Sequence, residues 1–151
     1  MKLRNAVVAA SLVSAVAVMT PIVAQAAPMS KTTTFKVDAV GKNVTGGMGI
    51  MGSAYAKGTI SVNPTKGTVC YSITTKGLKS ITMAHIHKGA KGVDGGVVVS
   101  LNISAFNSMS MKPTCEMVPT SIAKAIVAHP ASYYFNVHTA SYPGGAVRAQ
   151  L

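Results

Sequence analysis

Short segments in which apolar and polar residues alternate constrain this fold more than any other feature of the sequence. Residues 35–39 read Phe-Lys-Val-Asp-Ala, and residues 146–151 read Ala-Val-Arg-Ala-Gln-Leu. Successive side chains of a strand point to opposite faces, so this pattern is typical of strands with one buried face. Other segments rich in β-branched and aromatic residues predict further strands at residues 55–62, 68–75, 81–87, 97–101 and 133–139.

Turn-forming residues separate these segments. Residues 63–67 read Asn-Pro-Thr-Lys-Gly and predict a hairpin, and residues 142–145 read Tyr-Pro-Gly-Gly and predict a second turn. Residues 46–52 and 88–96 are glycine-rich and predict loops. Residues 102–116 are polar and methionine-containing, and no regular element is expected there.

A single helix is predicted at residues 119–128. Thr120 or Ser121 can cap its start, and Pro130 follows its end. Seven or so short strands with frequent turns favour an all-β fold, an antiparallel Greek-key-like sandwich or barrel that carries this one short helix. The length after the N-terminal region, residues 27–151, fits one domain.

The first 26 residues have the pattern of a cleavable signal peptide. Lys2 and Arg4 precede an apolar run at residues 6–18, and residues 24–26 read Ala-Gln-Ala, a small-x-small cleavage site. The apolar run is shorter than the about 20 residues that span a bilayer, so an uncleaved anchor is the less favoured alternative. We expect export to the periplasm or the extracellular space, and no transmembrane segment in residues 27–151.

Two cysteines, Cys70 and Cys115, are the only ones in the chain. In an exported protein an even number of cysteines favours a disulfide. The alternative is that one or both bind a metal as thiolates, but neither belongs to a Cys-x-x-Cys pair.

The region after the signal peptide is strongly basic. Without Lys2 and Arg4, twelve basic residues stand against three acidic ones, which leaves a net charge of +9. Such a charge attracts anionic envelope surfaces or acidic polysaccharide, although a merely soluble basic surface is the simpler interpretation. The basic residues are scattered lysines with one arginine, Arg148, so specific nucleic-acid binding is not indicated.

Three histidines are the residues best suited to carry chemistry. His85 and His87 lie two apart on a predicted strand, so both side chains point to the same face while Ile86 points into the core. His138 lies on the outward face of another predicted strand. If the two strands are neighbours, three imidazoles form a cluster that suits copper or zinc and leaves one coordination position open.

The alternative role for these histidines is structural, as hydrogen-bond partners of loop backbone. A metal site requires their nitrogens to lie within about 5 Å of one another, because each ligand sits about 2 Å from the ion. Met83 shares the face of His85 and is a further candidate ligand for copper. His129 precedes Pro130 at the predicted helix end, and we do not include it in the site.

Two segments resemble the hallmarks of the CHRD domain, a module named after the vertebrate protein chordin and common in bacterial exported proteins. The first reads AHIHKGAKG at residues 84–92 and GGVVV at residues 95–99. The second reads YYFNVHT at residues 133–139 and YPGGAVRAQL at residues 142–151. The resemblance implies an exported β-sandwich module, and in its bacterial form a bridge between Cys70 and Cys115, without fixing an activity.

Three functions follow as hypotheses. The first is a metal-binding exported protein that uses His85, His87 and His138. The second is a structural or adhesive envelope module with a basic surface and no metal. The third is a copper-dependent redox enzyme, suggested by a looser likeness to copper-zinc superoxide dismutase, which also has a His-x-His strand. Its bridging histidine and active-site arginine have no match here, and no other catalytic motif is present, so an enzyme is the less favoured interpretation.

Overall fold

The computed structural model describes residues 31–107 and 112–151, which form one curled antiparallel sheet of eight strands. The predicted signal peptide, residues 1–26, lies outside the described residues. The strand order is β5-β4-β7-β8-β1-β2-β3-β6. The strands are β1 (Thr33–Val40), β2 (Tyr55–Asn63), β3 (Thr68–Lys76), β4 (Ile81–Lys88), β5 (Val97–Ser100), β6 (Thr114–Met117), β7 (Tyr133–Thr139) and β8 (Tyr142–Gln150).

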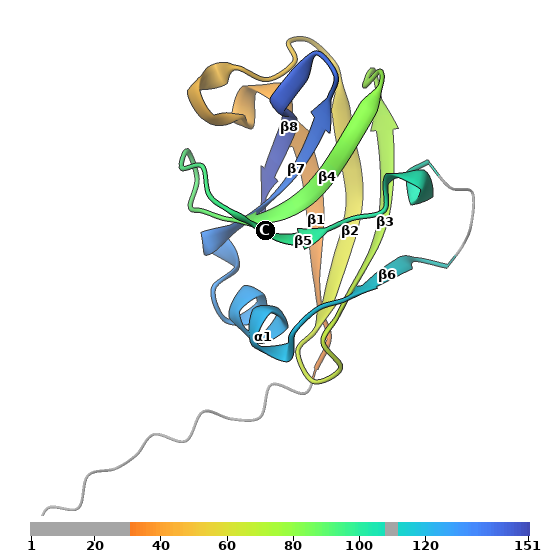
Figure 1. Cartoon of the computed structure of the whole chain (residues 1–151), viewed down its shortest axis with the longest axis vertical. Coiled ribbons are helices and arrows are strands. Elements are labelled where there is room, and N and C mark those ends of the chain that lie inside the picture. Colours follow the sequence, from red (N-terminus) through yellow and green to blue (C-terminus); the bar gives the residue numbers. More distant parts are fainter. Residues whose placement is uncertain (1–30, 108–111) are drawn as a thin grey trace, which may run out of the picture.

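The sheet folds back on itself so that two walls enclose the core (Figure 1). Strands β4, β7 and β8 form one wall and β1, β2 and β3 form the other, joined where Val40 of β1 pairs with Arg148 of β8. Ile86 and Phe135 from the first wall share one fully buried cluster with Ile60 from the second. Burial of these apolar side chains is the main force that holds the two walls together.

The segment after β5 closes most of the remaining gap between the walls. The Leu101 amide donates to the Ala84 carbonyl of β4 at 2.9 Å, and the Asn107 amide donates to the Ile73 carbonyl of β3 at 2.9 Å. A backbone segment that bonds to both walls makes the sheet a nearly closed barrel. The predicted all-β, antiparallel sandwich or barrel with one short helix is therefore confirmed.

Strand β6 is an element that the sequence pattern does not predict. It has only four residues and lies at the end of a polar, methionine-containing stretch, and it pairs with the outer edge of β3. Cys70 and Cys115 lie directly opposite each other in this pairing, and their sulfurs are at disulfide-bonding distance. The disulfide that the resemblance implies therefore holds β6 on the sheet.

Helix α1 (Thr120–Ala128) confirms the predicted helix but not its predicted cap. The helix follows Pro119 directly, and no side chain caps its start. The amides of Ile122 and Ala123 donate to the Pro119 carbonyl, so these two amides of the first turn are paired with backbone and not with a capping side chain. Among the helices of the described ranges, none has the length and apolarity needed to cross a bilayer.

The predicted turn at residues 142–145 is wrong, because β8 begins at Tyr142. The turn consists of Ala140 and Ser141, and Thr139 pairs with Tyr142 across it. The next pair is Val137 with Val147, so one residue of β7 faces the four residues 143–146 of β8. The Pro-Gly-Gly sequence forms a bulge within the strand, and proline and glycine are common in bulges as well as in turns.

Candidate metal centre

The three histidines lie on neighbouring strands, as a metal site requires. His85 and His87 belong to β4 and His138 belongs to β7, and these two strands pair along their length. Ile86 and Val137 point into the core, where both are fully buried. The histidines therefore share the face of the sheet that is turned away from the core, as predicted.

That face is largely covered at His87 and His138, which corrects the expectation of an exposed cluster. His87 is 8 % exposed and His138 is 6 % exposed, while His85 is partly buried. Two loops cover the face: residues 41–52 bond to β8, and residues 89–96 bond to both β4 and β8. The histidines thus lie in a layer between the sheet and these loops, where water competes less for their nitrogens.

The imidazoles are close enough to act on one ion. One ligand nitrogen from each of His85, His87 and His138 lies within 4.8 Å of the other two, which meets the 5 Å requirement. Bonds of about 2 Å to a tetrahedral ion place the nitrogens about 3.3 Å apart. One pair, His85 Nδ1 and His138 Nε2, is already 3.3 Å apart, and the wider separations would have to shorten around an ion.

Backbone carbonyls fix the orientation of two of the rings. His87 donates from Nδ1 to the Gly95 carbonyl at 2.9 Å, and His138 donates from Nδ1 to the Pro143 carbonyl at 2.8 Å. A neutral imidazole with its proton on Nδ1 presents the lone pair of Nε2. The structural role considered for these histidines is thus present, and it is also the arrangement that orients histidine ligands in metal sites.

The inner nitrogens form an incomplete hydrogen-bond set. Nδ1 of His85 lies 3.3 Å from Nε2 of His138, so His85 supplies the proton of that pair. Nε2 of His87 is buried and has no hydrogen-bond partner among the described residues. An unpaired buried polar atom costs about 1 to 3 kcal/mol, and a metal ion at Nε2 would remove that cost. The residues present therefore fit a copper or zinc ion.

The surroundings favour the neutral form of His85 and His87. Burial, and then the neighbouring His138 and His87, lower the pKa of His85. Burial is also the main cause that lowers the pKa of His87, with the hydrogen bond to Gly95 acting in the opposite direction. Neutral imidazole is the form that binds metal, so fewer protons compete with an ion at neutral pH.

Met83 and His129 occupy different positions relative to this centre. Met83 lies opposite His138 in the β4–β7 register and is 46 % exposed, so its role as a copper ligand stays a prediction. His129 is exposed and ends helix α1, as expected, and it is not part of the three-histidine group.

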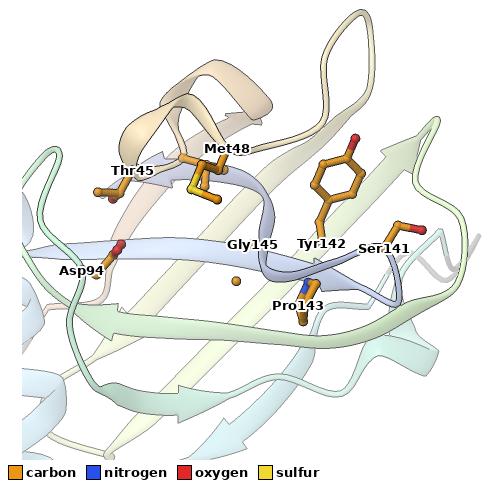
Figure 2. A pocket seen from close by; sticks show the side chains of 9 residues that line it. Thr45, Met48, Asp94, Ser141, Tyr142, Pro143 and Gly145 are labelled. Atoms are coloured by element: carbon orange, nitrogen blue, oxygen red, sulfur yellow. The ribbon is translucent and has the colours of Figure 1, made fainter.

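A cavity of about 280 Å³ adjoins the centre between the loop that follows β1 and the bulge of β8. Figure 2 shows Met48 on the loop side and Tyr142 and Pro143 on the strand side. Pro143 also accepts the Nδ1 proton of His138, so the cavity lies next to the nitrogen that points away from His85. The cavity therefore lies beside the histidine cluster and is not the open coordination position of a metal bound there.

Sequence reasoning missed the groups that orient the histidines. The Gly95 and Pro143 carbonyls are backbone atoms, and the residue type does not predict which backbone carbonyl will accept a hydrogen bond from a histidine. Tyr134 stacks on the His87 ring at 4.8 Å between centroids, and the Arg148 guanidinium lies over the Tyr134 ring. Only the lone arginine on a strand face, among many lysines, was a signal of a special role.

Together these observations define a class of protein: an antiparallel β-barrel-like domain with a layer of three histidines under two loops. The family model of the CHRD domain matches residues 27–151, so the chain belongs to the CHRD domain family. No curated protein and no solved structure matches the chain.

Proposed function

We propose that this CHRD-domain protein is exported and binds copper or zinc through His85, His87 and His138. The three nitrogens supply a ligand set that suits both metals, and a fourth position stays open for water or another ligand. Met83 is the added ligand that we propose for copper, since it lies opposite His138 and offers a soft thioether.

The observation that carries this proposal is that the outer nitrogens of two histidines are hydrogen-bonded while an inner nitrogen of the cluster has no partner. His87 and His138 each give their Nδ1 proton to a backbone carbonyl, and the Nε2 of His87 is buried without a partner. Nε2 of His138 faces His85 and accepts its Nδ1 proton, whereas the lone pair of His87 Nε2 is used by no group of the described residues. A purely structural histidine has no need to leave such an atom unsatisfied.

Export is supported by two independent features of the chain. Residues 1–26 have the three-part pattern of a signal peptide. Cys70 and Cys115 lie at disulfide-bonding distance, and disulfides persist mainly in oxidising compartments. Outside the cytoplasm, a histidine cluster meets copper and zinc without the buffering that the cell provides.

The test is a titration of metal-free protein with Zn²⁺ and Cu²⁺ by calorimetry. We expect one ion per chain, and we expect His85→Ala and His138→Ala each to weaken binding more than about 100-fold. Loss of groups that only orient a ligand costs 10- to 100-fold, so loss of a ligand should cost more.

The matched control is His129→Ala, which removes an exposed histidine outside the cluster and should leave the affinity unchanged. Equal affinities of His85→Ala and the unmodified protein would reject the three-histidine site. Failure of both metals to bind would reject the metal function and favour a structural role on anionic envelope polymers.

A further inference from the structure

Arg148 is a buried charged side chain that bonds to four acceptors and lies outside the hydrophobic core. It projects from β8 on the histidine side of the sheet and is 2 % exposed. Its Nη2 donates to the Ala90 carbonyl at 2.8 Å and to the Val93 carbonyl at 2.9 Å. Both carbonyls belong to the loop between β4 and β5, so the guanidinium holds the middle of that loop down on the sheet.

The other terminal nitrogen of Arg148 strengthens the same attachment. Nη1 donates to Asp94 Oδ1 at 3.3 Å and to Thr45 Oγ1 at 2.7 Å. Three of the four acceptors therefore lie within residues 90–94, and only Thr45 lies elsewhere. The planar fork of a guanidinium can bind several acceptors at once, which the single ammonium of a lysine cannot do in the same geometry.

Arg148 also supports the aromatic ring on which His87 rests. The Arg148 Cζ lies 3.4 Å from the centre of the Tyr134 ring, and the His87 ring stacks on Tyr134 with an interplanar angle of 4°. Because β7 lies between β4 and β8, His87 and Arg148 reach Tyr134 from strands on opposite sides. Cation, phenol ring and imidazole thus form one stacked column.

The column and the loop meet at Gly95. The Gly95 amide donates to the Tyr134 hydroxyl at 3.2 Å, and the Gly95 carbonyl accepts the Nδ1 proton of His87 at 2.9 Å. A side chain at Gly95 would collide with the Lys88 carbonyl, so only glycine brings the loop this close to β4. Arg148 contacts both neighbours of this point, the Tyr134 ring and the Asp94 side chain that precedes Gly95.

We infer that Arg148 is a positioning residue for the histidine cluster. It holds residues 90–94 and the Tyr134 ring in place, and these position the adjoining Gly95, whose carbonyl fixes the proton of His87 on Nδ1 and leaves Nε2 as the ligand atom. The consequence for metal affinity rests on the proposed function, but the effect on the His87 proton does not.

The ends of the loop are held without Arg148, which makes a substitution informative. The Lys88 amide donates to the Gly96 carbonyl at 2.9 Å, and Gln150 Nε2 donates to the Gly89 carbonyl at 2.9 Å. Loss of the guanidinium should therefore free the middle of the loop while both ends and the barrel stay in place.

The experiment compares the metal-free protein with Arg148→Lys by long-range ¹H–¹⁵N NMR of the imidazoles, which distinguishes a proton on Nδ1 from one on Nε2. In the unmodified protein we expect His87 to carry its proton on Nδ1. In Arg148→Lys we expect His87 to exchange between both tautomers, and the affinity for Zn²⁺ to fall about 10- to 100-fold, as for other groups that orient a ligand.

Thr45→Val is the matched control, because it removes a contact of the same guanidinium without touching residues 90–95. It should leave the His87 tautomer unchanged. An unchanged His87 tautomer in folded Arg148→Lys would overturn the inference, whether or not any metal binds. If Arg148→Lys fails to fold, Arg148→Met decides, because it keeps the buried stem, leaves no buried unpaired charge and removes every guanidinium contact; an unchanged His87 tautomer there has the same meaning.

Discussion

His87 shows at the residue scale how far a sequence pattern reaches. The period of two in His85-Ile86-His87 correctly places both imidazoles on one face and Ile86 in the core. The same pattern predicts solvent on the histidine side, and there it is wrong, since His87 is 8 % exposed. Strand alternation reports which side of the sheet a residue takes, but not what covers that side.

Burial of the histidines makes the metal-free fold sensitive to acid. The folded-state pKa of His85 and of His87 lies below the ordinary 6.5, mainly because of burial, so the unfolded chain takes up protons first as the pH falls. The free energy of unfolding should be flat above about pH 7 and should decrease from about pH 6.5 downward. Urea unfolding of chelator-treated protein between pH 8 and pH 5 measures this.

Only three carboxylates are present in the whole chain, so acid groups add little to the slope in this range. His85→Gln removes one of the two groups and should flatten the pH dependence. A slope that is the same in His85→Gln and in the unmodified protein would show that another group is responsible.

At the scale of elements, segments with a clear residue pattern are predictable even when short, since β5 with four residues lies at its predicted position, and β6 and the start of β8 are the exceptions. Strands β2, β3, β4 and β7 and helix α1 lie within a residue or two of their predicted positions. Strand β6 has only four residues and depends on its pairing with β3. The Pro-Gly-Gly sequence of β8 forms a bulge and not a turn, because its position is set by the pairs on either side.

The link between β6 and β3 should contribute strongly to stability. The bond between Cys70 and Cys115 closes a loop with a sequence separation of 45, for which chain entropy predicts about 4 kcal/mol. We expect Cys70→Ser/Cys115→Ser to lower the free energy of unfolding by about this amount, measured by urea denaturation. A loss below about 1 kcal/mol would mean that β6 is held mainly by its backbone pairing.

For the whole molecule, the barrel brings together groups that are far apart in the chain. His85 and His138 meet across 53 residues, and Arg148 reaches Ala90 across 58. The only arginine of residues 27–151 is buried, so the basic surface expected from the composition consists of lysines. The cluster exists only when β4, β7, β8 and both covering loops are assembled.

Metal binding should therefore stabilise the entire fold. An ion that binds the folded chain alone adds about 2.7 kcal/mol at a free concentration of 100 times Kd. For a domain of this size we expect Zn²⁺ to raise Tm by roughly 10 °C in a thermal scan. His138→Ala should lose this increase while His129→Ala keeps it, and an equal increase in both variants would place the ion elsewhere.

The sequence by itself determined the class of fold, the side of the sheet that each histidine takes and the cysteine pair, because these depend on local periodicity and on residue chemistry. Tertiary structure alone decided that the histidines lie under loops, that Gly95 and Pro143 orient two of them, and that Arg148 holds one of those loops. The physical reason is that residue type does not predict which backbone carbonyl or which loop a side chain will contact. These contacts form only when strands that are distant in the sequence pair.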